Sequence, residues 1–356
     1  MRYLLCTTEY PPQIGGVASY YGQLVAEWKK SAEIDIIDRS GMLARGPFPW
    51  RKAIWSLIKA LSGKDYQLVL IGQILPLGTA ALIARLVKTF RFAVFLHGMD
   101  LPFALKTPRK RWLSKLILKR AGFIICANSR VKEILLDFLP ELQDKVVIIN
   151  PGVVAQATDK AIKEELKDKY GLEGKKVLLS VGRLVERKGI DQAIKAFSQV
   201  EDASAIYLIA GDGPERRRLE ELASQSAAAA RILFLGAIKE EEKWPLLDLC
   251  DIFITVSREI EDDFEGFGIV YLEANLMGKP VIAGRSGGVG DAVEDEVNGL
   301  LVNPLATTEI TAAISELFAQ PEEAFRLGSQ GKSRAENNFS WSRQVAKLQG
   351  AIEKYI

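Results

Sequence analysis

Short runs of apolar residues alternate with longer segments of helical periodicity along the whole chain. A run that is apolar at nearly every position and is followed by a helix is typical of a parallel strand with both faces covered. The pattern therefore predicts an α/β fold with two parallel sheets, each covered by helices. The predicted strands are residues 2–7, 68–71, 92–96, 123–126 and 146–149 in the first half, and 177–181, 206–209, 232–235, 252–255, 280–282 and 300–302 in the second.

The cycle of strands and helices restarts after Asn150-Pro-Gly152, and this restart predicts a domain boundary. A chain of 356 residues is also too long for one ordinary hydrophobic core. We predict a Rossmann-like domain over residues 1–153 and a second over residues 154–338. The polar segment 158–169 is expected to open the second domain as a helix.

Cysteine usage and apolar content indicate a folded protein of a reducing compartment. Cys6, Cys126 and Cys250 are widely spaced and lie in or beside apolar runs, so we expect buried free thiols and no zinc site.

The start of the chain, residues 1–6, is too short for a lipid-modified leader and predicts a first strand. The longest uncharged apolar stretch, near residues 72–84, is too short to cross a bilayer. We expect a cytoplasmic protein.

The net charge of +2 hides an asymmetry between the two halves. Residues 1–155 contain 22 Lys and Arg against 11 Asp and Glu, a net charge of +11. The remaining residues contain 25 against 34, a net charge of −9. The basic first half is therefore expected to meet an anionic partner.

Two glutamates stand eight positions apart in Glu265-Gly-Phe-Gly-Ile-Val-Tyr-Leu-Glu273. Eight steps of a helix span roughly 12 Å, at about 1.5 Å per residue. This length is close to the separation of sugar and ribose in an extended nucleotide-sugar, so one carboxylate could hold sugar hydroxyls and the other ribose hydroxyls. Taken alone, the pattern fits two solvated charges beside an amphipathic helix at least as well.

Two cations follow the first predicted strand of the second domain, in Gly182-Arg-Leu-Val-Glu-Arg-Lys-Gly189. The planar donor fork of Arg183 and the point charge of Lys188 both suit phosphate oxygens, so a diphosphate is expected there. Surface charge after a strand is common without any ligand. We interpret Glu186 and Arg187 as solvated spacers.

The motif Gly-Arg-Leu-x-x-x-Lys-Gly, followed about eighty residues later by Glu-Gly-Phe-Gly-x-x-x-x-Glu-Ala, resembles glycosyltransferase family 4. Within that family the chain is most similar to bacterial phosphatidyl-inositol mannosyltransferase-like members. The resemblance covers essentially the whole chain. It continues through Lys279-Pro-Val-Ile-Ala283, Ser286-Gly-Gly288 and Asn298-Gly-Leu-Leu-Val-Asn-Pro304.

The resemblance implies the GT-B fold, in which two Rossmann-like domains face a cleft and the last helix, here residues 339–356, crosses back to the first domain. It implies a retaining enzyme that moves a hexose-type sugar from a UDP- or GDP-linked donor to a hydroxyl of a lipid-linked or polysaccharide acceptor in envelope glycan or glycolipid synthesis. Neither a metal nor another cofactor is implied. In the usual proposal for relatives, the leaving phosphate deprotonates the acceptor hydroxyl on the front face.

The resemblance also assigns roles to individual residues. Arg183 and Lys188 would stabilise the leaving diphosphate, since catalysis needs donors where negative charge develops. Glu265 would bind sugar hydroxyls, with help from backbone amides, and Glu273 would bind the ribose. The further donor-binding positions are Gly16, Gly182, Gly266, Phe267, Gly268 and Ile269.

Four residues of the first domain are further candidates. Gly15 and Gly16 precede the first predicted helix, residues 16–29, where they would let a ligand approach the backbone or would simply form a tight turn. His97 follows a predicted strand, at the end where ligands bind in open α/β sheets. The resemblance implies a catalytic role in contact with the transferred sugar, whereas a lone histidine is more often structural. Asp100 would orient acceptor hydroxyls or cap the next segment.

Two basic stretches, residues 45–59 and 106–120, contain aromatic residues, among them Trp50 and Trp55 in the first and Trp112 in the second, and could serve the acceptor. Such segments can lie on an anionic membrane, here the inner face of the cytoplasmic membrane, or can be packed helices with a solvated basic face. Nucleic acid is not expected as a partner, because no reading module is present.

Four observations bear on metal use, on donor contacts and on alternative functions. Asp262-Asp263 lacks the spacing of a metal-binding motif and is interpreted as loop acid. Relatives often have Glu after the paired glycines, whereas Gly290-Asp291 stands here, so Asp291 either serves the donor or caps a helix. A GT-B nucleotide-sugar epimerase would need more acids and bases than one histidine and this glutamate pair. A noncatalytic binding protein would be expected to lack one of Arg183, Lys188 or Glu265.

Overall fold

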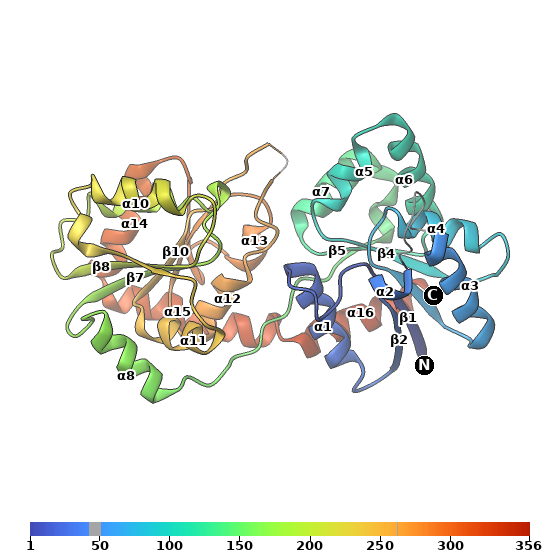
Figure 1. Cartoon of the computed structure of the whole chain (residues 1–356), viewed down its shortest axis with the longest axis horizontal. Coiled ribbons are helices and arrows are strands. Elements are labelled where there is room, and N and C mark those ends of the chain that lie inside the picture. The colour runs from blue at the N-terminus through green and yellow to red at the C-terminus, as the bar shows by residue number, and fades with distance from the viewer. Residues whose placement is uncertain (43–50, 262) are drawn as a thin grey trace. The chain divides into compact units, whose positions relative to one another are not determined.

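A computed structural model describes residues 1–42, 51–261 and 263–356 of the chain (Figure 1). The chain forms two compact units, Met1–Gly152 together with Trp341–Ile356, and Val153–Ser340. Each unit contains a six-stranded parallel sheet. The C-terminal segment therefore belongs to the same unit as the N-terminus.

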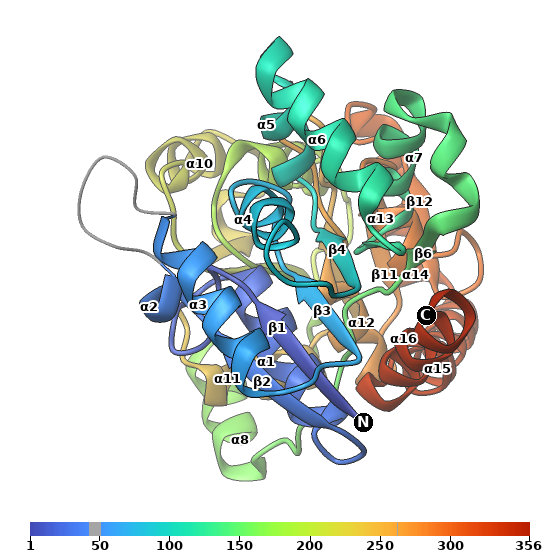
Figure 2. The ribbon, with the colours of Figure 1, turned by 90° about the vertical axis from the view of Figure 1, so that its right-hand side faces the viewer.

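The first unit has strand order β2-β1-β3-β4-β5-β6, with every neighbouring pair parallel. Figure 2 shows β1, β3 and β4 lying side by side. Strand β4 is buried at all five positions, as expected of a parallel strand covered on both faces. The strands are β1 (Arg2–Cys6), β2 (Glu33–Ile37), β3 (Leu68–Ile71), β4 (Phe92–Leu96), β5 (Ile124–Cys126) and β6 (Val146–Ile148).

Helices cover this sheet, and α16 packs against α1 in one shared core that includes Tyr20, Tyr21, Trp341 and Leu348. Side chains at two helix starts explain why the chain becomes helical there: Thr107 Oγ1 accepts from Lys110 N of α6 at 3.3 Å, and Asn128 Oδ1 accepts from Val131 N of α7 at 2.8 Å. The helices are α1 (Gly16–Trp28), α2 (Arg39–Met42), α3 (Arg51–Gly63), α4 (Leu77–Ala84), α5 (Asp100–Leu105), α6 (Pro108–Arg120), α7 (Ser129–Phe138), the 3₁₀ helix η1 (Pro140–Lys145) and α16 (Trp341–Tyr355).

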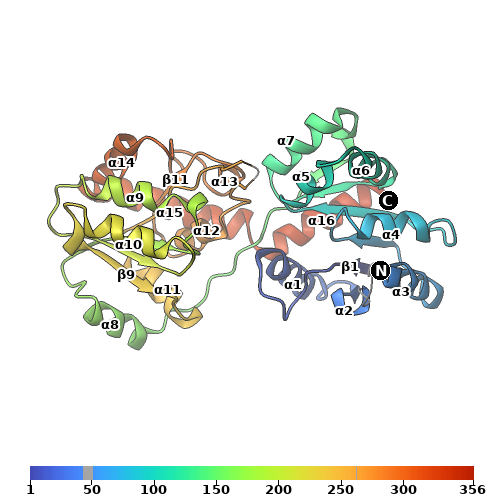
Figure 3. The same cartoon turned by 45° about the horizontal axis from the view of Figure 1, so that its top comes forward.

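The second unit has strand order β12-β11-β10-β7-β8-β9, again parallel throughout. Helices α9, α10 and α14 cover one face, and α8, α11 and α12 cover the other (Figure 3). The strands are β7 (Lys176–Val181), β8 (Ala205–Ala210), β9 (Ile232–Gly236), β10 (Ile252–Thr255), β11 (Val281–Gly284) and β12 (Gly299–Val302). The helices are α8 (Lys160–Lys169), η2 (Glu186–Lys188), α9 (Ile190–Phe197), α10 (Arg216–Ser224), η3 (Ala229–Arg231), α11 (Glu240–Leu249), α12 (Ile269–Leu276), α13 (Val289–Ala292), α14 (Thr307–Ala319) and α15 (Pro321–Asn338).

The two parallel sheets confirm the predicted α/β class, but the sequence pattern missed strand β2. This strand lies at the edge of its sheet, where it pairs with a single neighbouring strand, β1. Its only buried residue is Ile34, and Asp35 pairs with Lys64 at 2.8 Å. The apolar run that marks an interior strand is therefore absent from an edge strand such as this one.

The cysteines and the N-terminal segment agree with the sequence predictions. Cys6, Cys126 and Cys250 are free and buried, and burial raises the pKa of the Cys6 thiol to about 12. The first residues form strand β1. Within the described ranges, we find no helix that is both long and apolar enough to cross a membrane.

Candidate functional site

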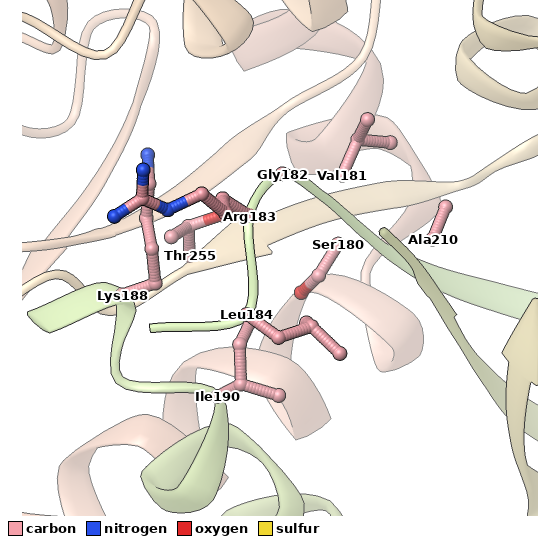
Figure 4. A pocket seen from close by; sticks show the side chains of 9 residues that line it. All are labelled: Ser180, Val181, Gly182, Arg183, Leu184, Lys188, Ile190, Ala210 and Thr255. Atoms are coloured by element: carbon pink, nitrogen blue, oxygen red, sulfur yellow. The ribbon is translucent and has the colours of Figure 1, made fainter. Parts of the chain in front are cut away.

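The loop after β7 carries the candidate phosphate-binding cations. It leaves the sheet through Gly182, turns at η2, and reaches α9 through Gly189, whose φ is +65°. A Cβ at Gly189 would collide with the carbonyl oxygen of Val256, so glycine is required by both conformation and space. Figure 4 shows the side chains of Arg183 and Lys188 on the same side of this loop.

A small pocket opens at the carboxyl end of β7, where ligands bind in parallel α/β sheets. Its floor is fixed by Ser180, whose Oγ donates to the Ile254 carbonyl at 2.5 Å and lies 2.7 Å from Tyr207 Oη. Two cations and a glycine backbone thus border a pocket that the hydrogen-bonded Ser180 also lines. The lining residues are Ser180, Val181, Gly182, Arg183, Leu184, Lys188, Ile190, Ala210 and Thr255 (Figure 4).

Glu265 lies against this loop and accepts from two cations through one oxygen. Its Oε2 is 2.5 Å from Lys188 Nζ and 2.8 Å from Arg187 Nη1, and Ser257 Oγ is 3.4 Å away. Burial by itself raises the pKa of Glu265, but the charges of Lys188 and Arg187 outweigh it, so the pKa lies below its usual value. The structure therefore brings the predicted Lys188 and Glu265 together as an ionised pair.

Arg187 is not the solvated spacer that the sequence predicted. Its side chain is 24% exposed, and it pairs with Asp263 at 3.2 Å as well as with Glu265. The Arg187 carbonyl also accepts from the backbone N of Arg258 at 2.8 Å. No local sequence signal indicates this role, because Glu265 is 78 residues further along the chain. Glu186 is 60% exposed, as expected of a solvated residue.

Arg183 differs from Arg187 and Lys188 because its side chain is exposed to solvent and can contact a ligand. Among the residues that the structure describes, it makes neither an ion pair nor a side-chain hydrogen bond, whereas Lys188 and Arg187 are both paired with Glu265. A guanidinium group with five donors and no protein acceptor is suited to binding an anion.

Glu265 and Glu273 are not joined by one continuous helix, so the predicted spacing of eight helical steps is wrong. Residues 265–268 are not helical, and α12 begins at Ile269 after Gly268, whose φ is +76°. Glu273 pairs with Lys243 of α11 at 3.0 Å. Burial raises the pKa of Glu273, and Lys243 only partly offsets this effect.

Backbone contacts with Gly287 and Gly288 hold the segment around Glu265 in place. The Glu265 carbonyl accepts from Gly288 N at 2.8 Å, and a Cβ at Gly287 would lie 2.5 Å from the same carbonyl oxygen. Phe267 is buried against Phe339, so its ring belongs to the core. Ile269 is 40% exposed, and Gly266 is partly exposed. Gly287 and Gly288, the paired glycines of the motif Ser286-Gly-Gly288, thus position the backbone of Glu265.

Three further acidic residues, Asp262, Asp263 and Asp291, were considered from the sequence. Asp291 lies on the short helix α13, and its carbonyl accepts from Arg334 Nη2 at 3.2 Å. Asp263 pairs with Arg187, and Asp262 lies outside the described residues. Within the described part of the chain, no group of three or more His, Cys, Asp or Glu residues is arranged to hold a metal ion.

In the first unit, His97 follows β4 and is surrounded by aromatic rings. Its Nε2 lies 2.7 Å from Tyr21 Oη, and its ring stacks on Phe95 at 5.8 Å and meets Tyr20 edge-on at 5.0 Å. Burial lowers the pKa of His97 to about 3, so the imidazole is neutral at physiological pH. His97 therefore has no positive charge to offer a phosphate.

Asp100 holds the turn that follows His97. Its Oδ1 accepts from the backbone N atoms of His97 at 3.1 Å and Gly98 at 3.0 Å. Burial raises the pKa of Asp100 to about 6, and these backbone donors limit the rise. Asp100 is itself the first residue of α5, which has no side-chain cap, so its carboxylate holds the preceding turn and the structure shows neither of the two roles that the sequence left open.

Gly15 and Gly16 stand at the start of α1, which has no side-chain cap. Both are exposed, and a Cβ at either position would meet nothing within 4 Å. The fold itself therefore does not require glycine at either position.

The second basic stretch forms α6, with Ser114, Ile117 and Leu118 buried beneath it. Trp112 is 66% exposed, and Phe103 on α5 is 50% exposed with Lys110 Nζ lying 3.4 Å above its ring. The first stretch is described only from residue 51, so Trp50 lies outside the described residues; Trp55 on α3 is 70% exposed.

Two family models match the chain. The model described as Glycosyltransferase Family 4 matches residues 14–157, and that of Glycosyl transferases group 1 matches residues 162–334. The GDP-mannose-dependent alpha-(1-6)-phosphatidylinositol monomannoside mannosyltransferase of Mycolicibacterium smegmatis is 29% identical over 97% of this chain and 96% of its own length. The alpha-D-kanosaminyltransferase of Streptomyces kanamyceticus is 25% identical over 68% of this chain and 63% of its own length.

The fold has solved counterparts. The crystal structure of Anabaena HepE in complex with UDP has a TM-score of 0.82 and 17% identity, covering 99% of this chain and all of that one. Similarity at this level establishes the fold, and the two parallel-sheet units are those of the GT-B glycosyltransferases. Since family models match both units, the chain belongs to the family 4 glycosyltransferases of the GT-B fold.

Proposed function

We propose that this enzyme transfers a hexose-type sugar, with retention at the anomeric carbon, from a nucleoside-diphosphate sugar to a hydroxyl of a lipid-linked or glycan acceptor. The observation that carries the proposal is the loop after β7. It presents Arg183, which is unpaired among the described residues, and the Glu265-bound Lys188 at the ligand-binding end of a parallel sheet. The diphosphate of the donor is the anion that this arrangement would take.

The chemical step needs positive charge where the phosphate leaves. When the anomeric C–O bond breaks, the electron pair goes to the phosphate oxygen of the nucleoside diphosphate. Arg183 and Lys188 would stabilise that charge without a metal ion. The same phosphate oxygen would take the proton of the acceptor hydroxyl as the new glycosidic bond forms, which balances the reaction without a separate base.

Glu265 would change partners when the donor binds. In the free protein its carboxylate is bound to Lys188 and Arg187. A diphosphate would compete for Lys188, which leaves lone pairs of Glu265 to accept from sugar hydroxyls. Glu273 would serve the ribose hydroxyls, which requires that its contact with Lys243 be shared or broken.

GDP-mannose is the first donor to test, because a relative that matches along nearly its whole length is named for it. The UDP-bound structural neighbour makes UDP-glucose the second. Transfer would be followed with a radiolabelled sugar and a short polyprenyl or phosphatidylinositol acceptor, with and without EDTA. Nuclear magnetic resonance of the product would report the anomeric configuration.

The variant that tests the proposal is Arg183→Ala. We expect kcat to fall by about 10²- to 10³-fold, as for loss of one donor to a developing oxyanion. Arg217→Ala is the matched control, since Arg217 is an exposed arginine of the same unit that pairs with Glu221 of its own helix. Equal activity of Arg183→Ala and the wild type would refute the proposed phosphate role.

We also propose that α5 and α6 attach the enzyme peripherally to an anionic membrane, where a lipid-linked acceptor resides. The exposed rings are Phe103 on α5 and Trp112 on α6, and α6 also carries the exposed cations Arg109, Arg111 and Lys115. Flotation with phosphatidylglycerol vesicles should show binding that the double variant Phe103→Ala/Trp112→Ala reduces severalfold. Binding that is the same in both proteins would contradict this attachment.

A further inference from the structure

A buried tyrosine is the direct partner of the candidate histidine. Tyr21 lies on α1 and is completely buried. Its hydroxyl oxygen is 2.8 Å from the Gly72 carbonyl oxygen and 2.7 Å from His97 Nε2. The three groups come from α1, from the residue after β3 and from the residue after β4. One hydroxyl therefore connects two neighbouring strand ends.

The protons at this junction can be assigned. A carbonyl oxygen only accepts, so the Tyr21 hydroxyl must donate its single proton to Gly72. The Tyr21 oxygen then faces His97 Nε2 with lone pairs only, and the contact at 2.7 Å is a hydrogen bond only if Nε2 carries a proton. The reverse arrangement would leave the buried Gly72 carbonyl without a donor, which is unfavourable.

From this geometry we propose that Tyr21 is a positioning residue that fixes His97 as the neutral tautomer protonated at Nε2. The aromatic surroundings oppose the doubly protonated form, because Tyr20, Tyr21 and Phe95 pack around the imidazole. Asp100, three residues further along the chain, is engaged with backbone N atoms through Oδ1. The ring is thus held by one hydrogen bond and three aromatic contacts.

The tautomer decides what His97 recognises. With the proton on Nε2, Nδ1 has a lone pair and can only accept. Among the described residues, Nδ1 has no hydrogen-bond partner. Such a nitrogen selects a hydroxyl group of a sugar or alcohol and rejects a phosphate or carboxylate. This consequence rests on the proposed function, whereas the tautomer does not.

His97 is the only histidine of the chain, so protein labelled with ¹⁵N-histidine gives one imidazole spin system. In the wild type we expect Nε2 to resonate as a protonated nitrogen and Nδ1 as an unprotonated one, with no change between about pH 5 and 8. A proton on Nδ1, or titration within this range, would overturn the proposal. This measurement needs no variant and no substrate.

The variant Tyr21→Phe removes one oxygen and keeps the ring. We expect the Nδ1-protonated form to rise from undetectable to a measurable fraction. Tyr20→Phe is the matched control, because Tyr20 is the adjacent ring beside His97 but donates to the Ile149 carbonyl at 2.9 Å. A tautomer that is unchanged in both variants would show that Tyr21 does not set it.

Activity provides the second readout and separates the two proposals. In the glycosyl-transfer assay, Tyr21→Phe should lower kcat/KM by about tenfold or more, while Tyr20→Phe stays near the wild type. If neither variant differs from an active wild type, the tautomer does not matter for the reaction. If the wild type transfers no sugar from any donor, the proposed function fails, while the resonance assignment still decides the tautomer.

Discussion

At the scale of single residues, the carboxylate of Glu265 is the centre of the candidate donor site. The sequence predicted this residue and Lys188, because each belongs to a recognisable motif. It missed Arg187, whose partner is distant in sequence and is brought near only by the fold. Motif spacing therefore identifies residues that share a chemistry, whereas ion-pair partners depend on tertiary contacts.

The Glu265 cluster predicts a pH-dependent stability. Its folded pKa is below the unfolded value of about 4.3, so its contribution is complete above that pH and is lost as the pH falls through the folded pKa. Glu265→Gln should lower the free energy of unfolding by about 3 kcal/mol at pH 7, because Lys188 and Arg187 lose their shared acceptor. Urea unfolding from pH 3 to pH 7 should show this difference shrinking below about pH 4.

Glu241→Gln is the control for this titration, since Glu241 is exposed and pairs with Lys239 at 3.3 Å. It should change the free energy of unfolding by less than about 0.5 kcal/mol throughout. A Glu265→Gln difference that grows as the pH falls would contradict the sign of the argument.

Arg187 predicts a catalytic effect of its own. Arg187→Ala leaves Lys188 as the one cation bound to Glu265, so the carboxylate loses one of its two ion-pair contacts. We expect kcat/KM for the donor to fall about tenfold, equivalent to about 1.4 kcal/mol. Steady-state kinetics beside the Arg217→Ala control would measure it. A fall no larger than that of the control would restore the solvated-spacer interpretation.

At the scale of elements, the interior strands follow from their apolar runs, and the last helix, expected over residues 339–356, is observed as α16 over Trp341–Tyr355. Where the structure differs from the sequence prediction, the cause is local. β2 is an edge strand with charges, and the turn at Gly268 stops the helical spacing from reaching Glu265. Periodicity thus identifies buried elements best, because burial is what produces the pattern.

The loop between β7 and α9 depends on Gly189. Gly189→Ala should destabilise the protein by about 3 kcal/mol or more, since the new Cβ meets both a positive φ and the Val256 carbonyl. Gly174→Ala measures the cost of the positive φ without the steric clash, because Gly174 has a φ of +66° and a Cβ there would meet nothing within 4 Å. It should cost only about 1 kcal/mol. Chemical denaturation would compare them, and equal costs would contradict the steric argument.

At the scale of the whole molecule, the chain ends in the unit where it began. Trp341 is the first residue of α16, and a Cβ at Gly152 would lie 2.6 Å from Trp341 Cδ2. Trp341 also meets Tyr20 of α1 edge-on at 5.4 Å. The amphipathic pattern of α16 predicts a helix, but it carries no information about which surface the helix covers. That assignment came from the family resemblance.

Helix α16 should therefore stabilise the first unit. Leu348 is completely buried against α1 and the sheet, so Leu348→Ala should lower the free energy of unfolding of this unit by about 2–5 kcal/mol. Hydrogen exchange of the β1 and α1 amides would report the loss. Leu305→Ala, at a position that is 67% exposed, should leave these amides unchanged. Unchanged exchange in Leu348→Ala would contradict a stabilising role for α16.

The most direct test of the central claim is calorimetric titration of GDP-mannose and UDP-glucose without divalent metal. We predict that the wild type binds at least one donor, and that Lys188→Ala lowers its affinity by about 10- to 100-fold, the effect of losing a charge-assisted hydrogen bond. Lys195→Ala, an exposed lysine on α9, should bind as the wild type does. Equal affinity of wild type and Lys188→Ala for a bound donor would contradict the assignment of the diphosphate to this loop.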